Sequence, residues 1–227
     1  MRSARTGDET NGILYRRRME HAQAMRKQLK RAIAALLLLA PLMPPPAFAA
    51  EVQAAEKLVP YAVSGSSAIE LYRSIGERGP KSRNGRAIAL TDYRLTWTRK
   101  YVPEGGNCRL TTAVPHLTLI THLPKPSGKL PARTEALWAT FIAGITAHER
   151  VHGEIIKATV DAIRSATEGL TVPDDPACRK IRAEVTKRVA ALADEMRKKN
   201  RDFDHVEMGK GGNVQQLILA LVNGDRD

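Results

Sequence analysis

The feature that most constrains the fold is a long stretch, roughly Ala132 to Thr167, in which apolar residues recur every three or four positions. These residues are Trp138, Phe141, Ile142, Ile145, Val151, Ile155, Ile156, Val160 and Ile163. A period near 3.6 places them on one face of an α-helix. Gly169 follows as a C-terminal stop signal. The stretch therefore predicts one long amphipathic helix.

A second helix is predicted downstream, with Asp174-Asp175 as its cap and Pro176 at its first position. Its apolar residues fall on one face: Ile181, Val185, Val189, Leu192 and Met196. A shorter element is expected from Val214 to Val222.

Short strands are predicted upstream of the long helix. Leu58 to Val63 is typical of a strand, and Ser66-Ser67 with Glu70 forms a capping box for a short helix that Gly79-Pro80 ends. From Ala87 the apolar residues alternate with polar ones, which indicates a half-buried strand.

A turn-forming segment, Pro103 to Asn107, separates that strand from a second strand region, Cys108 to Leu123. Pro115 favours an edge or a bulge where that region begins. The predicted fold class is α+β: a small antiparallel sheet packed against two long helices.

Residues 25–49 have the pattern of an export signal. A basic segment beginning at Met25 precedes the apolar run Ala32 to Ala40, and Ala47-Phe48-Ala49 matches a signal-peptidase site. The apolar run is about half the length that spans a bilayer, so no stable membrane span is expected after cleavage. We therefore expect a periplasmic or secreted protein.

The predicted domain organisation follows from this leader. Residues 1–24 are expected to be a non-native or disordered extension and residues 25–49 a signal peptide. Residues 50–57 are expected to form a flexible tail, and residues 58–222 a single domain.

The net charge of +12, from 36 Lys and Arg against 24 Asp and Glu, depends strongly on the leader. After residue 49 there remain 27 Lys and Arg against 21 Asp and Glu, a net charge of +6 on 178 residues. These cations are not interleaved with aromatic residues, so no nucleic-acid partner is expected. With 43% hydrophobic residues and two cysteines, the composition also excludes collagen-like and disulfide-dense classes.

Cys108 and Cys178 are the only cysteines of the chain. An isolated pair in an exported protein is most simply a disulfide. A pair of zinc thiolates is the weaker interpretation, because the chain has no C-x-x-C spacing.

The chemistry is concentrated in the long helix, which contains His148-Glu149-Arg150-Val151-His152. Residues four apart lie on one helical face, so both imidazoles can bind a single Zn²⁺ ion. Glu149 is rotated about 100° from His148 and suits the role of general base toward a water on the metal. The motif predicts His148 and His152 as zinc ligands and Glu149 as the catalytic residue.

At these residues the chain resembles the predicted secreted zinc-dependent proteases grouped as domain of unknown function 922. The matching features are Tyr61-Ala-Val-Ser-Gly65, Gly79-Pro80, the Trp97 strand, Cys108, Leu137-Trp138, His148 to His152, Cys178 and Phe203-Asp204. The resemblance covers about residues 58–211. It implies a zincin-like fold and a zinc-dependent peptidase activity.

The third zinc ligand is less clearly indicated. A metzincin continuation is excluded, because Ile155 and Ala158 stand where Gly and His are required. A carboxylate from the following helix, Glu184 or Glu195, is one alternative.

The family resemblance supplies a further pair of alternatives for this ligand. Such proteins typically follow the aromatic-Asp pair with Thr-x-His-Gly, where this chain has Glu207 for Thr and Gly209 for His. Glu207 is the favoured third ligand and His205 the alternative.

The sequence thus predicts an exported zinc metallopeptidase that hydrolyses peptide or protein substrates, with cell-wall peptides as one substrate class. A non-catalytic envelope binding protein on a protease-like scaffold is the alternative, favoured by the missing Thr-x-His-Gly stretch.

Overall fold

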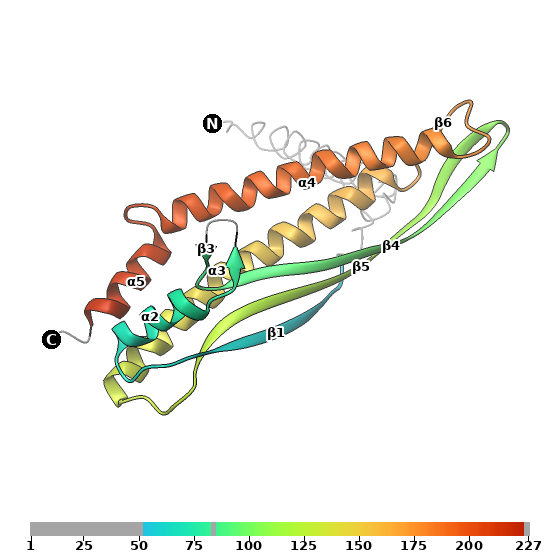
Figure 1. Cartoon of the computed structure of the whole chain (residues 1–227). Coiled ribbons are helices and arrows are strands. Elements are labelled where there is room, and N and C mark those ends of the chain that lie inside the picture. The colour runs from blue at the N-terminus through green and yellow to red at the C-terminus, as the bar shows by residue number, and fades with distance from the viewer. Residues whose placement is uncertain (1–51, 83–84, 225–227) are drawn as a thin grey trace, which may run out of the picture. The chain divides into compact units, whose positions relative to one another are not determined.

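The computed structural model describes residues 52–82 and 85–224. Residues Ala50–Asp227 form one compact unit, in which helices and a sheet are mixed (Figure 1). The predicted extension and signal peptide, residues 1–49, lie outside the described residues. Among the described helices, none is long and apolar enough to cross a bilayer.

Two long strands form the centre of the sheet. Strand β4 (Leu90–Glu104) and strand β5 (Asn107–Pro126) are antiparallel and joined at Gly105-Gly106. Both glycines have positive φ, as a two-residue hairpin turn requires. The predicted hairpin is confirmed.

The prediction of a purely antiparallel sheet was wrong. Strand β1 (Ala54–Val63) pairs with β5 in parallel, so the sheet is mixed, with the order β1-β5-β4. A short strand β6 (Thr171–Val172) adds to β5 in antiparallel orientation. The hydrophobic alternation of a strand sets which face is buried but not the direction of its neighbour, which explains the error.

Strand β1 also begins earlier than expected. Residues 54–57, predicted to belong to a flexible tail, pair with Leu117 to Ile120 of β5. Val52, just before the strand, is buried and donates its N–H to Asp161 Oδ2 at 3.3 Å. The tail prediction was wrong for this segment because its hydrogen bonds come from a distant strand.

Pro115 lies where the structure can accommodate it. Pairing between β1 and β5 starts at Leu117, so Pro115 pairs only with Trp97 of β4. Its missing N–H therefore removes no bond to β1.

The helices confirm most of the predicted boundaries. Helix α3 spans Ala132–Thr167, as predicted, and Gly169 follows with positive φ. Helix α2 spans Ala68–Arg78 and begins at the predicted capping box, with Ser67 as N-cap and Glu70 reaching back. Helix α5 spans Asn213–Asn223, one residue longer at each end than the predicted element.

Helix α4 (Arg179–Met208) begins three residues later than predicted. Cys178 has a left-handed backbone conformation, which ends the preceding turn. The carboxylate of Asp175 instead accepts the N–H groups of Arg179 at 2.7 Å and Ile181 at 2.9 Å. Asp175 thus satisfies the first N–H groups of the helix from outside it.

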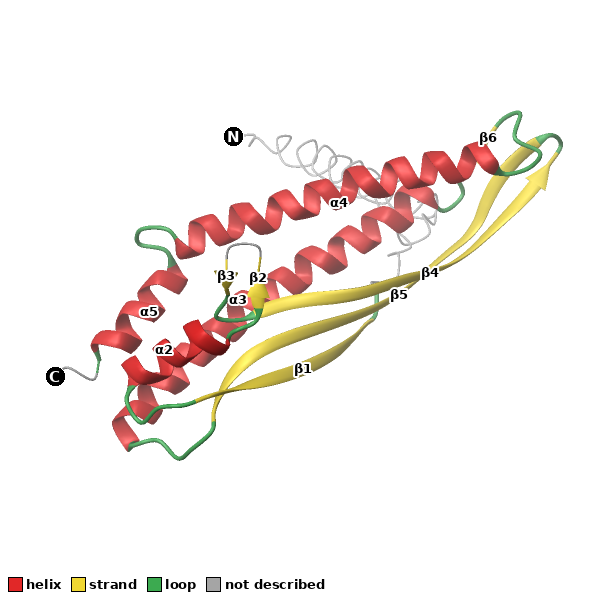
Figure 2. Cartoon of the chain, in the orientation of Figure 1, coloured by secondary structure: helices red, strands yellow, loops and turns green. Residues whose placement is uncertain are grey.

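The long helices stack in layers on the sheet. Helix α3 packs on β5, and α4 runs along α3 (Figure 2). The apolar face of α3 joins two clusters, one with α2 and α5 around Phe141 and one with the sheet around Leu117 and Leu119. A third cluster surrounds the disulfide between Cys108 and Cys178, whose Cα atoms are 5.3 Å apart. This disulfide, expected from the sequence, ties the hairpin end of β5 to the start of α4.

Two short strands complete the fold. Strands β2 (Lys81–Ser82) and β3 (Gly85–Arg86) pair with each other in a separate antiparallel ladder between α2 and β4.

Candidate metal centre

The two predicted histidine ligands lie together on the face of α3 that meets α4. His148 Nε2 and His152 Nε2 are 3.1 Å apart. Both side chains are largely buried, and the rings stand nearly perpendicular to each other. The helical spacing of four residues therefore does bring both ring nitrogens to one point.

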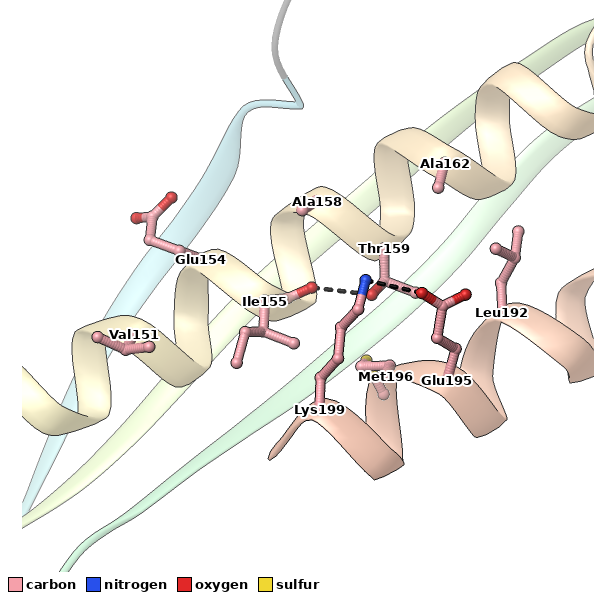
Figure 3. Close-up of a pocket in the computed structure, with 10 residues that line it drawn as sticks. All are labelled: Val151, Glu154, Ile155, Ala158, Thr159, Ala162, Leu192, Glu195, Met196 and Lys199. Carbon is pink, nitrogen blue, oxygen red and sulfur yellow. Dashed lines mark hydrogen bonds and ion pairs between the residues drawn. The ribbon is translucent and has the colours of Figure 1, made fainter. Parts of the chain in front are cut away.

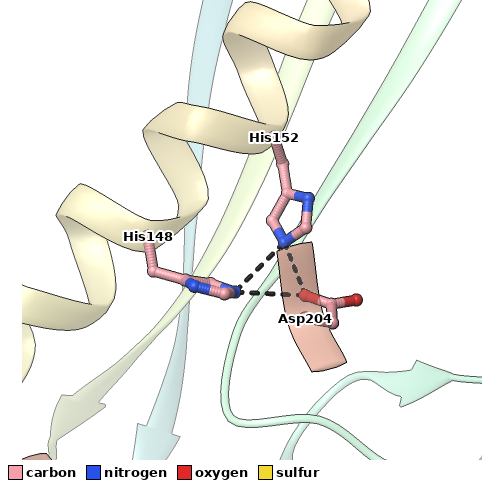
Figure 4. A group of neighbouring side chains, drawn as sticks. All are labelled: His148, His152 and Asp204. Atoms are coloured by element: carbon pink, nitrogen blue, oxygen red, sulfur yellow. Dashed lines mark hydrogen bonds and ion pairs between the residues drawn. The ribbon is translucent and has the colours of Figure 1, made fainter. Parts of the chain in front are cut away.

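A carboxylate from α4 completes the group. Asp204 Oδ1 lies 2.9 Å from His152 Nε2 and 3.3 Å from His148 Nε2 (Figure 4). No other described group of three or more His, Cys, Asp or Glu side chains has this convergence. Two helices thus supply three donor atoms to one small volume.

The sequence-based choice of third ligand needs correction, because Asp204 occupies the place assigned to Glu207 or His205. Glu207 lies one helical turn further along α4, and its Oε2 is 3.8 Å from the other ring nitrogen of His148, Nδ1. His205 follows Asp204 directly, is exposed, and is not among the three converging donors. Asp204 and Glu207 are three residues apart and share one face of α4. Only Asp204 approaches the Nε2 atoms of both histidines.

The other carboxylates considered for this role have partners elsewhere. Glu184 binds Arg188 Nε at 2.8 Å. Glu195 binds Lys199 Nζ at 2.8 Å, and both line a groove of about 340 Å³ between α3 and α4 (Figure 3). That groove contains none of the three metal-donor residues.

The three donors fit a zinc ion. Zn²⁺ binds His nitrogen and carboxylate oxygen at about 2.0–2.2 Å in tetrahedral geometry, which separates neighbouring donor atoms by roughly 3.3–3.5 Å. The three donor atoms are separated by 2.9, 3.1 and 3.3 Å. The longest separation equals the lower end of the tetrahedral range, and the other two are a few tenths of an ångström shorter. Two His and one carboxylate are also a donor set used by catalytic zinc sites, with a fourth position left for water.

The orientation of His152 suits metal binding as well. Asn200 Nδ2 donates to Met196 O at 2.9 Å, which turns Asn200 Oδ1 toward the imidazole. His152 Nδ1 donates to that oxygen at 2.5 Å. With its proton on Nδ1, the neutral ring presents the lone pair of Nε2 to Asp204 and His148.

Phe203 packs against both imidazoles. Its ring stacks on His148 with centroids 4.7 Å apart and meets His152 edge-on at 5.3 Å. This aromatic contact restricts the rotation of both rings, which holds the donors in place.

Glu149, the predicted general base, points from α3 toward the start of β4. Its side chain is only 6% exposed, and Thr91 Oγ1 donates to its Oε2 at 2.7 Å. Burial raises the pKa of Glu149, and the Thr91 hydrogen bond and the two imidazoles partly offset this effect. The carboxylate is therefore held in one orientation next to the metal-donor group.

Charges within the donor group shift its own titration. Burial lowers the pKa of His152, but the hydrogen bonds that its ring donates to Asp204 and Asn200 raise the pKa by more, so the net pKa is above the ordinary value of 6.5. Burial raises the pKa of Asp204, but the hydrogen bonds that it accepts from both imidazoles lower the pKa by more. The net pKa of Asp204 is therefore well below the ordinary value of 3.8.

These shifts predict how the metal-free protein responds to pH. The raised pKa of His152 contributes stability below about pH 6.5 that is lost as the pH rises through the raised value. The lowered pKa of Asp204 contributes stability above about pH 3.8 that is lost as the pH falls. The melting temperature of the metal-free protein should therefore be highest between about pH 4 and 6.5 and fall toward pH 8.

Thermal unfolding in the presence of a chelator tests this expectation. Asp204→Asn should flatten the dependence above pH 6.5, because an amide cannot stabilise an imidazolium to the same extent. Equal pH profiles for Asp204→Asn and the parent chain would contradict the assignment.

Comparison with known proteins places the chain in a family. The family model described as "Bacterial protein of unknown function (DUF922)" matches residues 58–212, which include all three metal donors and both cysteines. The chain belongs to this family. No curated protein and no solved structure matches the chain.

The sequence interpretation missed four members of the site: Thr91, Asn200, Phe203 as a ring contact, and Asp204 as a donor. Three of them lie on α4 beyond Met196, where the apolar face of that helix should continue. Polar residues such as Asn200 and Asp204, placed where the apolar face of an amphipathic helix should continue, are an available signal for a site. Thr91 carries no such signal, since a threonine in a strand is ordinary.

Proposed function

We propose that this DUF922 protein is an exported zinc-dependent metallopeptidase with a zincin-like site. The observation that carries the proposal is the convergence of Asp204 with His148 and His152, next to the buried carboxylate of Glu149. A periplasmic or secreted location follows from the predicted leader, and the substrate is a peptide or protein.

His148, His152 and Asp204 would hold the metal. When bound, zinc acts as a Lewis acid toward a carbonyl and lowers the pKa of a water molecule to about 7. Glu149 would accept the proton of the attacking water and return it to the leaving amine. Thr91 would keep the Glu149 carboxylate directed at that water.

A strand edge without a strand partner supports a peptide as the substrate. Among the described strands, β4 pairs only with β5, so its other edge has no strand partner. The same strand carries Thr91 near its start, directly bonded to Glu149. An extended peptide added to this edge would therefore run past the catalytic carboxylate.

A non-catalytic envelope binding protein is the alternative. The lack of the Thr-x-His-Gly stretch favoured it, because a third ligand was missing there. Asp204 supplies a donor from a different position, which weakens that support.

Metal analysis of the exported chain tests the proposal first. The protein, expressed with its leader and purified without chelator, is expected to carry one zinc ion per chain by elemental analysis and native mass spectrometry. The zinc-loaded protein is expected to cleave unfolded polypeptides or cell-wall stem peptides, and product masses identify which class is hydrolysed. Absence of zinc after incubation with a stoichiometric amount would leave only the binding-protein alternative.

A further inference from the structure

The outer ring nitrogens of the two histidines have different surroundings. His152 Nδ1 donates to Asn200, as described above. His148 Nδ1 is buried and has no hydrogen-bond partner among the described residues. Its side chain is only 3% exposed, and a buried ring nitrogen normally has a hydrogen-bond partner.

Glu207 is the polar group closest to satisfying this nitrogen. Its Oε2 lies 3.8 Å from His148 Nδ1, beyond hydrogen-bond distance by less than an ångström. Asn213 Nδ2, at the first residue of α5, donates to the same oxygen at 3.3 Å. Glu207 is therefore held on the Nδ1 side of the His148 ring, opposite the Nε2 atom that faces Asp204.

The residues of α4 form a consistent arrangement around the two imidazoles. Asn200, Asp204 and Glu207 are spaced by four and three residues, so they share one face of the helix. Asp204 faces the inner nitrogens of both rings, Asn200 the outer nitrogen of His152, and Glu207 the outer nitrogen of His148.

We propose that Glu207 is a positioning residue that accepts the Nδ1–H of His148 and so fixes the ring with Nε2 toward the metal. Metal-binding histidines nearly always donate their other ring nitrogen to a carboxylate or carbonyl, which orients the ring and raises its basicity. Only a small side-chain movement brings Glu207 to bonding distance. The inference deepens the proposed function and rests on its metal-binding part alone.

Zinc affinity tests the proposal without any need for enzymatic activity. Competition with a chromophoric chelator is measured for the parent, Glu207→Ala and Glu207→Gln. Glu207→Ala is expected to weaken zinc binding about 10–100-fold, the usual effect of losing an outer partner. Glu207→Gln should restore most of the affinity, because its amide oxygen still accepts the bond.

Two further variants serve as references. Glu195→Gln, an exposed carboxylate on the same helix that binds Lys199, should leave affinity unchanged. Asp204→Ala should weaken binding more than Glu207→Ala, because it removes a direct donor.

Long-range ¹H–¹⁵N spectra of the histidine rings provide a readout that a purely structural role of Glu207 would not change. In the zinc-bound parent, His148 should show a slowly exchanging proton on Nδ1. In Glu207→Ala that proton should exchange faster, while the Nδ1 proton of His152, bonded to Asn200, stays unchanged.

The outcomes separate this inference from the proposed function. A parent chain that binds no zinc overturns both. A parent that binds zinc, with equal affinity in Glu207→Ala, overturns the positioning role alone. If Asp204→Ala keeps its zinc while Glu207→Gln loses as much affinity as Glu207→Ala, Glu207 is itself the ligand and the positioning role is wrong.

Discussion

Replacing Glu149 by Gln is expected to lower kcat for peptide hydrolysis by at least about 100-fold, because general-base catalysis contributes roughly 10²–10⁴-fold. The amide has nearly the same shape as the carboxylate and can still accept the Thr91 hydrogen bond, but it cannot take a proton. Glu149 is not among the three metal donors, so one zinc ion should remain bound. The decrease should appear in kcat, with KM little changed.

A matched control lies on the same helix. Glu154 is exposed and binds Lys157 at 3.0 Å, so Glu154→Gln removes a carboxylate without touching the site. It should cleave as fast as the parent. If Glu149→Gln also cleaves at the parental rate, the proposed mechanism is wrong.

Glu149→Gln should also raise the melting temperature of the metal-free protein. The carboxylate is 6% exposed and its pKa is raised by burial, so its charge is costly to keep in the fold. Removing that charge relieves the cost at neutral pH. A variant that loses activity but gains stability is the signature of a functional residue rather than a structural one.

Removing the disulfide between Cys108 and Cys178 is expected to lower the free energy of unfolding by about 4 kcal/mol. The bond joins residues 70 apart in sequence, and chain-entropy models give this magnitude for a loop of that length. Urea unfolding of the Cys108→Ala/Cys178→Ala double variant measures the effect as a lower midpoint.

A redox comparison controls for the loss of packing. Both cysteines are buried beside Leu110 and Ile181, so alanine also removes some apolar contact. The parent chain in reductant should lose most of the same stability, while the double variant should not respond to reductant. Equal midpoints for the oxidised and reduced parent would show that the bond contributes little.

The helices were predictable because their signals are local. The period of three and four residues set the ends of α3 correctly, and the Ser67–Glu70 box set the start of α2. The start of α4 was misplaced because Asp175 caps the helix from four residues before its first residue, Arg179. The presence of a capping residue in a sequence does not determine how many residues separate it from the first residue of the helix.

The sheet and the third donor depended on distant parts of the chain. The parallel pairing of β1 with β5 brings together segments about 60 residues apart, and neither strand's pattern specifies its partner. Asp204 lies 52 residues after His152, and its role depends on the register in which α4 packs on α3. The spacing of four residues predicted that His148 and His152 lie together, because such a pattern relates residues of one helix. It could not predict a donor from a second helix.

The split of the three converging donors between two helices has a consequence for the proposed peptidase. Before α4 has docked on α3, the chain offers a metal the two imidazoles of α3 without the converging carboxylate of Asp204. In the proposed peptidase, hydrolytic competence would then arise only once the two helices have docked, so copies with an undocked α4 would not digest their neighbours.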